Sequence, residues 1–282
     1  HGGLECRLES NDNRVDLHQY ILHDQVEPEL LMDHIRRCNW EQHDTWRRIE
    51  DMCRHWRQPG TSLHLWVSQI WLEFDIHGQS GNIPSPSVFF QLRPPGPETD
   101  SINDLFADVL DLLEPLITRS DRDCLLAALT RCAQHCPAGA GITHIGLMLS
   151  RKPSPIRINV KSLSADEWSP FLQVIKWPGP VSELSDLVDP LYDKTDQLVF
   201  CLDIGDRVFP DLGLECLVTA DLDRRSAWES FLDDLVKSGM ASGGKRDAVS
   251  NWGRFIKPPD AAQRWPEDLV AESLLLGPIA FR

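Results

Sequence analysis

The sequence predicts an α+β protein whose antiparallel β-sheet closes into a barrel, with the helices outside. Two observations support this: pairs of strand-like segments alternate with pairs of helix-like segments, and the two segments of each strand pair are joined by turn-rich connections. Strands joined by short turns must be antiparallel, and closure removes the exposed edges of an open sheet. An open two-layer α+β sandwich is the alternative, because each helix pair could equally cover one hairpin.

The first 60 residues are predicted to be helical. From Pro28 onward, apolar side chains recur at about helical spacing, and Pro59 and Gly60 end the pattern. These side chains are Leu30, Leu31, Ile35, Cys38, Ile49, Cys53 and Trp56. Residues 61–282 then carry the repeated strand-pair and helix-pair units, and we expect the whole chain, 1–282, to form a single domain.

The strands are predicted from segments rich in β-branched and aromatic residues, bounded by glycine, proline and polar residues. They pair as 63–76 with 87–93, 143–151 with 156–161, and 197–205 with 212–219, and an interrupted strand covers 279–282.

The helices between these pairs are predicted from apolar residues at helical spacing. Their ranges are 102–113, 121–136, 165–175, 181–192, 226–238, 245–252 and 266–276. Asp121 is a suitable N-cap for its helix, and Ser164 with Glu167 has the spacing of a capping box.

Charge and cysteine usage exclude some classes of partner. Lys and Arg total 28 against 43 Asp and Glu, and the resulting net charge of −15 argues against nucleic acid or an anionic membrane as the main partner. No apolar stretch is long enough for a transmembrane helix. The eight cysteines are irregularly spaced, so we expect reduced thiols in a cytoplasmic protein. Cys132, His135 and Cys136 lack a second ligand pair, so no metal site is predicted from them.

Side chains alternate along a strand, and here one face of the predicted strands is apolar while the other is polar and carries both signs of charge. That polar face holds Gln69, Trp71, Glu73, Asp75, Arg157, Asn159, Lys161, Cys201, Asp203, Gly213, Glu215 and Leu217, and Phe89, Gln91 and Arg93 share a face of their strand. Two interpretations remain open. The polar face is solvated, with charges paired across strands, or it lines a lumen where cations hold an anionic ligand and a carboxylate acts as base.

Residues 144–172, HIGLMLSRKPSPIRINVKSLSADEWSPFL, resemble the ABBA, or PT-barrel, prenyltransferases. Here a strand ending in Arg151 is followed by a second strand that carries Arg157 and Lys161 in alternation, and then by a helix. A weaker likeness extends through 198–218, so the resemblance covers about half of the chain. The cyanobactin-type peptide prenyltransferases are the nearest members in size.

The resemblance implies prenyl transfer from an allylic diphosphate to a peptide or aromatic acceptor in natural product biosynthesis, with Mg²⁺ as the implied cofactor. By position it implies that Arg157 and Lys161 bind the diphosphate, with Arg93 or Arg151 as helpers. Glu73 is the implied base.

The chain departs from the family in its tyrosines. The family commonly shields the allyl cation with several of them, whereas this chain has only Tyr20 and Tyr192, and neither lies in a predicted strand. Trp71 and Phe89 are predicted to replace them, with Trp66 and Phe90 as the neighbouring choices, because aromatic faces attract cations. The second hypothesis is a non-catalytic peptide- or protein-binding module with the same fold or an open sheet.

Overall fold

The computed structural model describes residues 2–6, 8, 15–75, 85–94, 102–113, 122–149, 155–218, 225–251 and 279–281. Its strands form one nine-stranded antiparallel sheet in which every strand lies beside its neighbours in the chain. The strands are β1 (Gly2–Cys6), β2 (Val15–Leu22), β3 (Val67–Phe74), β4 (Ser87–Leu92), β5 (Gly141–Leu147), β6 (Ile156–Lys161), β7 (Gln197–Ile204), β8 (Val208–Val218) and β9 (Ile279–Phe281).

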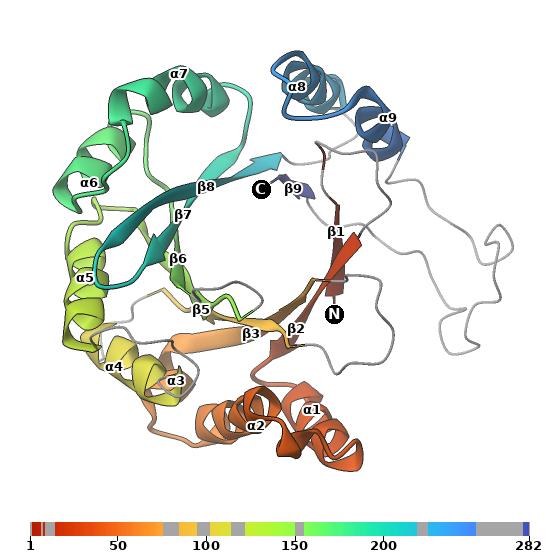
Figure 1. Cartoon of the computed structure of the whole chain (residues 1–282), viewed down its shortest axis with the longest axis vertical. Coiled ribbons are helices and arrows are strands. Elements are labelled where there is room, and N and C mark those ends of the chain that lie inside the picture. Colours follow the sequence, from red (N-terminus) through yellow and green to blue (C-terminus); the bar gives the residue numbers. More distant parts are fainter. Residues whose placement is uncertain are drawn as a thin grey trace, which may run out of the picture.

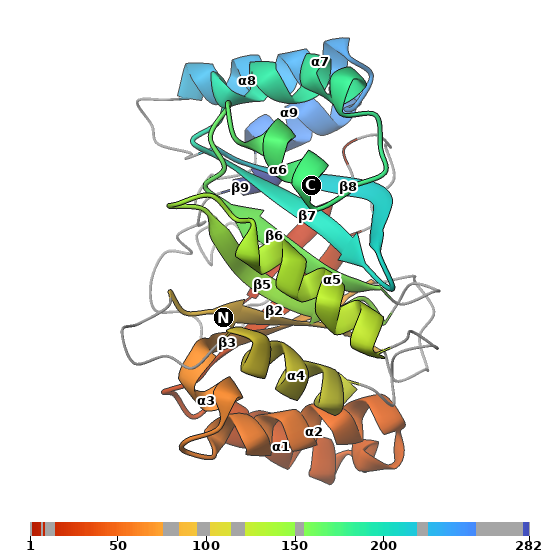
Figure 2. The same ribbon diagram turned by 90° about the vertical axis from the view of Figure 1, so that its left-hand side faces the viewer.

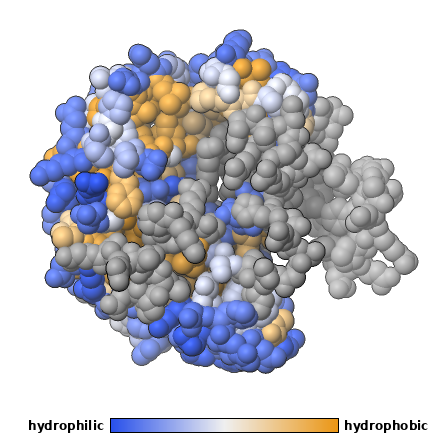
Figure 3. Space-filling view, viewed as in Figure 1, coloured by the Kyte–Doolittle hydropathy of each residue, from blue (hydrophilic) through white to orange (hydrophobic). Residues whose placement is uncertain are grey.

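The helices lie on the outer side of a strongly curled sheet (Figure 1). They are α1 (Glu27–Arg37), α2 (Asp44–Arg57), α3 (Ser62–Trp66), α4 (Ile102–Leu113), α5 (Arg122–Gln134), α6 (Trp168–Val174), α7 (Val181–Tyr192), α8 (Arg225–Lys237) and α9 (Gly243–Asn251), with a short 3₁₀ turn at Trp40–Gln42. Figure 2 shows α5 lying across the outside of β5 and β6. Figure 3 shows mainly hydrophilic side chains on the surface formed by α1 and α2. The prediction of an α+β protein with an antiparallel sheet and helices on one side is therefore confirmed.

The predicted closure into a barrel is wrong for the described residues. There, β1 pairs with β2 and β9 pairs with β8, and no ladder joins β1 to β9. The sheet is thus open between its first and last strands, as in the alternative that the sequence left open. All three residues of the short strand β9 pair with β8, at Cys216, Leu217 and Val218. The sheet curls, but its edge strands β1 and β9 are not paired with each other in the described residues.

The prediction that residues 1–60 are helical is wrong before α1, where β1 and β2 lie. β2 pairs with β3 from Leu17 opposite Phe74 to Leu22 opposite Gln69. Its sequence, VDLHQYIL, has polar residues on both faces, so the period of two is weak, and the pairing with β3 decides the conformation.

The predicted strand 63–76 also starts too early. Residues Ser62–Trp66 form the short helix α3, because Thr61 caps it: the Thr61 hydroxyl accepts a hydrogen bond from the His64 backbone N–H at 3.2 Å.

The predicted strand 156–161 and the helices 102–113 and 181–192 are confirmed at their exact bounds. The Ser164 backbone N–H donates to Glu167 Oε2 at 3.0 Å, which is one half of the predicted capping box and lowers the pKa of Glu167. Asp121 and the predicted helix 266–276 lie outside the described residues.

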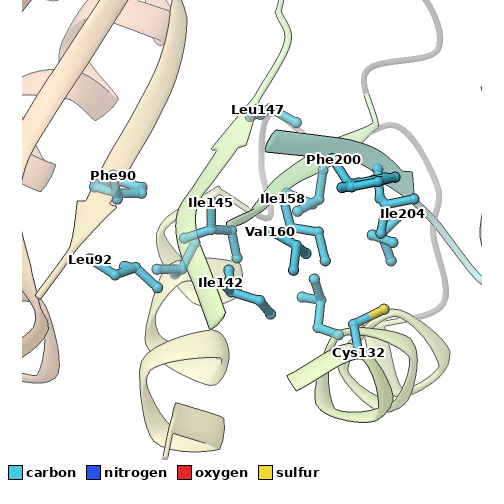
Figure 4. Packing of buried hydrophobic residues seen from close by; sticks show 14 of the residues in the cluster. Phe90, Leu92, Cys132, Ile142, Ile145, Leu147, Ile158, Val160, Phe200 and Ile204 are labelled. Carbon is cyan, nitrogen blue, oxygen red and sulfur yellow. The ribbon is translucent and has the colours of Figure 1, made fainter. Parts of the chain in front are cut away.

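The hydrophobic core lies between the sheet and the helical layer. Strand residues such as Phe90, Ile158 and Phe200 are fully buried in one cluster with helix residues such as Phe106 and Phe171. Figure 4 shows Cys132 of α5 among the aliphatic side chains of the central strands. Its burial raises the pKa of the Cys132 thiol to about 12, as expected for a packing residue.

The cysteines whose side chains the structure describes are free thiols: Cys38, Cys53, Cys124, Cys132, Cys136, Cys201 and Cys216. Cys201 lies opposite Gly213 on β8, whereas Cys216 lies opposite Leu198 and belongs to the core under the helices. The two thiols of this neighbouring pair therefore face opposite sides of the sheet, as their positions in the sequence predicted.

Gly146 on β5 is required by the close packing of the sheet. A Cβ at this position would overlap both the Phe89 ring and the Val88 carbonyl oxygen. We predict that Gly146→Ala lowers the free energy of unfolding by about 2 kcal/mol, because a neighbouring strand must move. Urea denaturation measures the change. Gly141→Ala on the same strand is the matched control, since a Cβ there meets no atom within 4 Å. Equal stability of the two variants would contradict the prediction.

Candidate functional site

The face of the sheet turned away from the helices carries the polar side chains, and we call it the inner face. By strand alternation it includes Asp16, His18, Tyr20, Gln69, Trp71, Glu73, Ser87, Phe89, Gln91, His144, Gly146, Arg157, Asn159, Lys161, Val199, Cys201, Asp203, Gly213, Glu215 and Leu217. It is not simply a solvated surface, because His144, Asn159, Asp203 and Glu215 are all buried. On β2, β3 and β4, in contrast, His18, Tyr20, Trp71, Glu73 and Gln91 are only partly buried.

One row of direct cross-strand partners crosses the inner face. In order along the row, it consists of Tyr20, Trp71, Phe89, Gly146, Arg157 and Asp203. Direct partners in antiparallel strands have side chains roughly 5 Å apart. The row therefore begins with aromatic rings, passes over a glycine, and ends with a cation and a carboxylate.

Arg157 on β6 and Asp203 on β7 form a bidentate ion pair. Arg157 Nε donates to Asp203 Oδ1 at 2.7 Å, and Arg157 Nη2 donates to Asp203 Oδ2 at 2.9 Å. The side chains are 14% and 8% exposed, so water screens the pair weakly. This geometry holds the guanidinium in one orientation and compensates its charge. Pairing of charges across strands, which the sequence left as one interpretation, is thus present at this position.

An aromatic cluster occupies the other end of the row. The centroid of the Trp71 ring lies 5.2 Å from that of Tyr20 and 5.4 Å from that of His18, and His144 meets Trp71 edge-on at 5.5 Å. The prediction that Tyr20 lies outside the strands is wrong, because Tyr20 lies on β2 beside Trp71. Trp66 belongs to the core under the helices.

Two glutamines on neighbouring strands share the Trp71 indole. Trp71 Nε1 donates to Gln69 Oε1 at 3.1 Å and to Gln91 Oε1 at 3.2 Å. Gln69 and Gln91 are themselves direct cross-strand partners. The sequence predicted Gln69 on the polar face and Gln91 on the same face of its strand as Phe89 and Arg93, without a role for either glutamine. Only the register of β3 and β4 brings the two amides to the same N–H.

A second buried carboxylate, Glu215 on β8, accepts hydrogen bonds from two neutral side chains of the inner face. Asn159 Nδ2 donates to Glu215 Oε1 at 3.3 Å, and Cys201 Sγ donates to the same oxygen at 3.5 Å. Asn159 Oδ1 is buried without a hydrogen-bond partner in the described part of the chain. Asn159 Oδ1 is therefore an acceptor on the inner face to which a donor group of a ligand would hydrogen-bond.

The remaining predicted site residues lie away from the row. Glu73 lies opposite His18 and Ser87, on one side of the row, whereas Lys161 lies opposite Gly141 and Val199, on the other side. Glu73 and Lys161 are therefore not neighbours in the register. Lys161 makes no hydrogen bond or ion pair with the described residues.

Arg93 follows β4, where its Nε donates to the Val67 carbonyl oxygen at 3.4 Å and its backbone N–H to the Trp66 carbonyl oxygen at 2.6 Å. It therefore helps to hold the start of β3. Arg151 lies outside the described residues. Of the predicted site residues, the structure thus brings together Trp71, Phe89 and Arg157.

Comparison with known proteins provides no independent assignment, since no family model matches this chain and no curated protein matches it significantly. Within the described ranges, no three His, Cys, Asp or Glu side chains are grouped so as to hold a metal ion. Among the helices of those ranges, none has both the length and the apolar character needed to cross a membrane.

The Arg157–Asp203 pair gives a stability prediction. Asp203→Asn should lower the free energy of unfolding by about 3 kcal/mol, because it removes the carboxylate charge that pairs with the largely buried Arg157 guanidinium through two hydrogen bonds. The double variant Arg157→Met/Asp203→Leu should recover most of that loss, since it removes both charges. Urea denaturation of both variants measures the difference. Asp211→Asn, at an exposed position of β8, is the control. A double variant no more stable than Asp203→Asn would refute this account.

Proposed function

We propose that the inner face binds an allylic diphosphate and transfers its prenyl group to an aromatic or peptide acceptor. The observation that supports this most strongly is the row that aligns Tyr20, Trp71 and Phe89 with Arg157. A leaving diphosphate needs cations, and the allyl cation that remains needs aromatic faces. The row offers both on one face of the sheet, with only Gly146 of β5 between the aromatic residues and Arg157.

In the proposed reaction, the bond between the allylic carbon and the diphosphate oxygen breaks, and diphosphate leaves with the electron pair. The faces of Trp71 and Tyr20 stabilise the allyl cation. A nucleophilic atom of the acceptor then forms the new bond to the allylic carbon. The acceptor loses a proton to Glu73, which lies two residues from Trp71 on β3.

The two inner-face cations would take different parts in holding the diphosphate. Lys161 is not engaged by a described residue and is the better candidate for direct binding. Arg157 is oriented by Asp203, so it would bind the diphosphate while shared with that carboxylate. The described residues include no group of three or more His, Cys, Asp or Glu that could hold Mg²⁺, and the proposed steps use only side chains of this chain. The proposed location is the cytoplasm, where the free thiols would stay reduced.

A non-catalytic binding module is the second candidate, and one observation favours it. Among the described residues, the inner face carries four carboxylates, Asp16, Glu73, Asp203 and Glu215, against the two cations Arg157 and Lys161, and Arg157 is already paired. A face with this balance would also suit a neutral or cationic segment of a peptide.

Calorimetry with an unreactive analogue, dimethylallyl S-thiolodiphosphate, tests the proposal with Mg²⁺ present. We expect binding to the unaltered protein, and Lys161→Ala should weaken it by about tenfold or more, because a charge-assisted hydrogen bond contributes about 1.5–3 kcal/mol. Lys237→Ala on the outer helix α8 removes the same charge away from the inner face and should leave the affinity unchanged. Absence of binding to the unaltered protein would overturn the prenyltransferase proposal in favour of the binding module.

A further inference from the structure

The shared indole N–H determines how the amides of Gln69 and Gln91 are oriented. An amide side chain can present either its oxygen or its NH₂ group to a neighbour. The Trp71 indole nitrogen is a donor only, so it can bond only to oxygen. The distances of 3.1 and 3.2 Å therefore require that both Oε1 atoms face the indole. Both NH₂ groups must then point elsewhere.

These two NH₂ groups form a pair of donors that no described residue accepts from. Neither Gln69 Nε2 nor Gln91 Nε2 has a hydrogen-bond partner in the described part of the chain. Both residues are partly buried, and neither nitrogen is among the fully enclosed unsatisfied atoms. Solvent or a ligand can therefore reach them. Because Gln69 and Gln91 are direct partners on β3 and β4, their side chains leave the sheet side by side.

The same glutamine pair adjoins the aromatic cluster. The indole that orients both amides is the central ring of the group formed with Tyr20 and His18. A ligand whose flat ring packs beside the Trp71 indole has both glutamine side chains as direct neighbours, since each is hydrogen-bonded to that indole. Donors without a nearby acceptor favour an oxygen that accepts hydrogen bonds and disfavour an ammonium group.

We infer that Gln69 and Gln91, oriented by Trp71, bind an acceptor oxygen, a carboxylate or a phenolate, on an aromatic substrate of the inner face. This inference rests on the proposed function, because it assigns the prenyl acceptor to the aromatic class instead of the peptide class. The binding site itself requires no diphosphate. It can therefore be tested when the proposed chemistry fails.

The decisive variants are Gln69→Glu and Gln91→Glu. Each keeps an oxygen that accepts from the indole N–H, and each replaces the outward NH₂ donor with a carboxylate oxygen. Gln19→Glu is the matched control: it makes the same change on neighbouring β2, at an exposed position opposite Leu72, a core residue, and therefore on the other face of the sheet. Trp71→Phe is a further variant that keeps a ring but removes the N–H that orients both amides. Circular dichroism establishes that each variant is folded.

The probes are 2-naphthoate, 2-naphthol and 2-naphthylmethylamine, measured by calorimetry without any diphosphate. We expect the unaltered protein to bind naphthoate or naphthol at least about tenfold more tightly than the amine, and the better of the two identifies the oxygen. Gln69→Glu and Gln91→Glu should each weaken this binding by about tenfold and strengthen binding of the amine. Trp71→Phe should also weaken it, and Gln19→Glu should not.

Three results would overturn the inference: no binding of either oxygen probe to the unaltered protein, a preference for the amine, or glutamate variants that bind naphthoate as the control does. If naphthoate binds as expected and dimethylallyl S-thiolodiphosphate does not bind, the proposed prenyl transfer fails while the aromatic site stands. If the diphosphate analogue binds but both glutamate variants behave like the control, only the assignment of the acceptor fails.

Discussion

The alternation of side chains along the strands is the constraint on which the rest of the structure depends. Ile70, Phe90 and Ile158 are buried beneath the helices. Burying them forces the adjacent Trp71, Phe89 and Arg157 onto the other face, because successive side chains on a strand point to opposite sides. A slip of one residue in any strand would reverse this arrangement, so the hydrophobic core also determines the position of the candidate site.

The inner face contains buried polar groups, and burying a polar or charged group costs free energy of folding. Asp203 and Glu215 are buried, in a chain whose net charge is already −15. Asp203 is compensated by the two hydrogen bonds from Arg157, and Glu215 accepts from Asn159 and Cys201. A sheet selected only for stability would place apolar residues at such positions, since a buried ion pair contributes little net stability. The presence of these groups on the inner face is one reason to propose that this face binds a ligand.

The two ends of the inner face differ in how far their polar groups are buried and hydrogen-bonded to other residues of the chain. Toward β6, β7 and β8 the polar groups are buried and bound to one another. Toward β2, β3 and β4 the Trp71 cluster and the two glutamines are partly exposed, with amide donors that no described group accepts. This difference places the accessible chemistry at the aromatic end, whereas the resemblance of the sequence directs attention to the cationic end.

The sequence by itself determined the elements whose local signals are strong and the sorting of residues between the two faces. Strand 156–161 alternates clearly between aliphatic and polar residues, and helices 102–113 and 181–192 have clear apolar spacing, so their bounds could be predicted. Only the tertiary structure decided that 15–22 is a strand, because its own alternation is weak and its backbone hydrogen bonds come from pairing with β3. That pairing places Tyr20 beside Trp71. The register of β3 and β4 brings Gln69 and Gln91 to one indole, and the pairing of β6 with β7 joins Arg157 to Asp203. The tertiary structure also decided that the sheet is open. Side chains alternate in the same way in open and closed sheets, and only the pairing of the two edge strands distinguishes them.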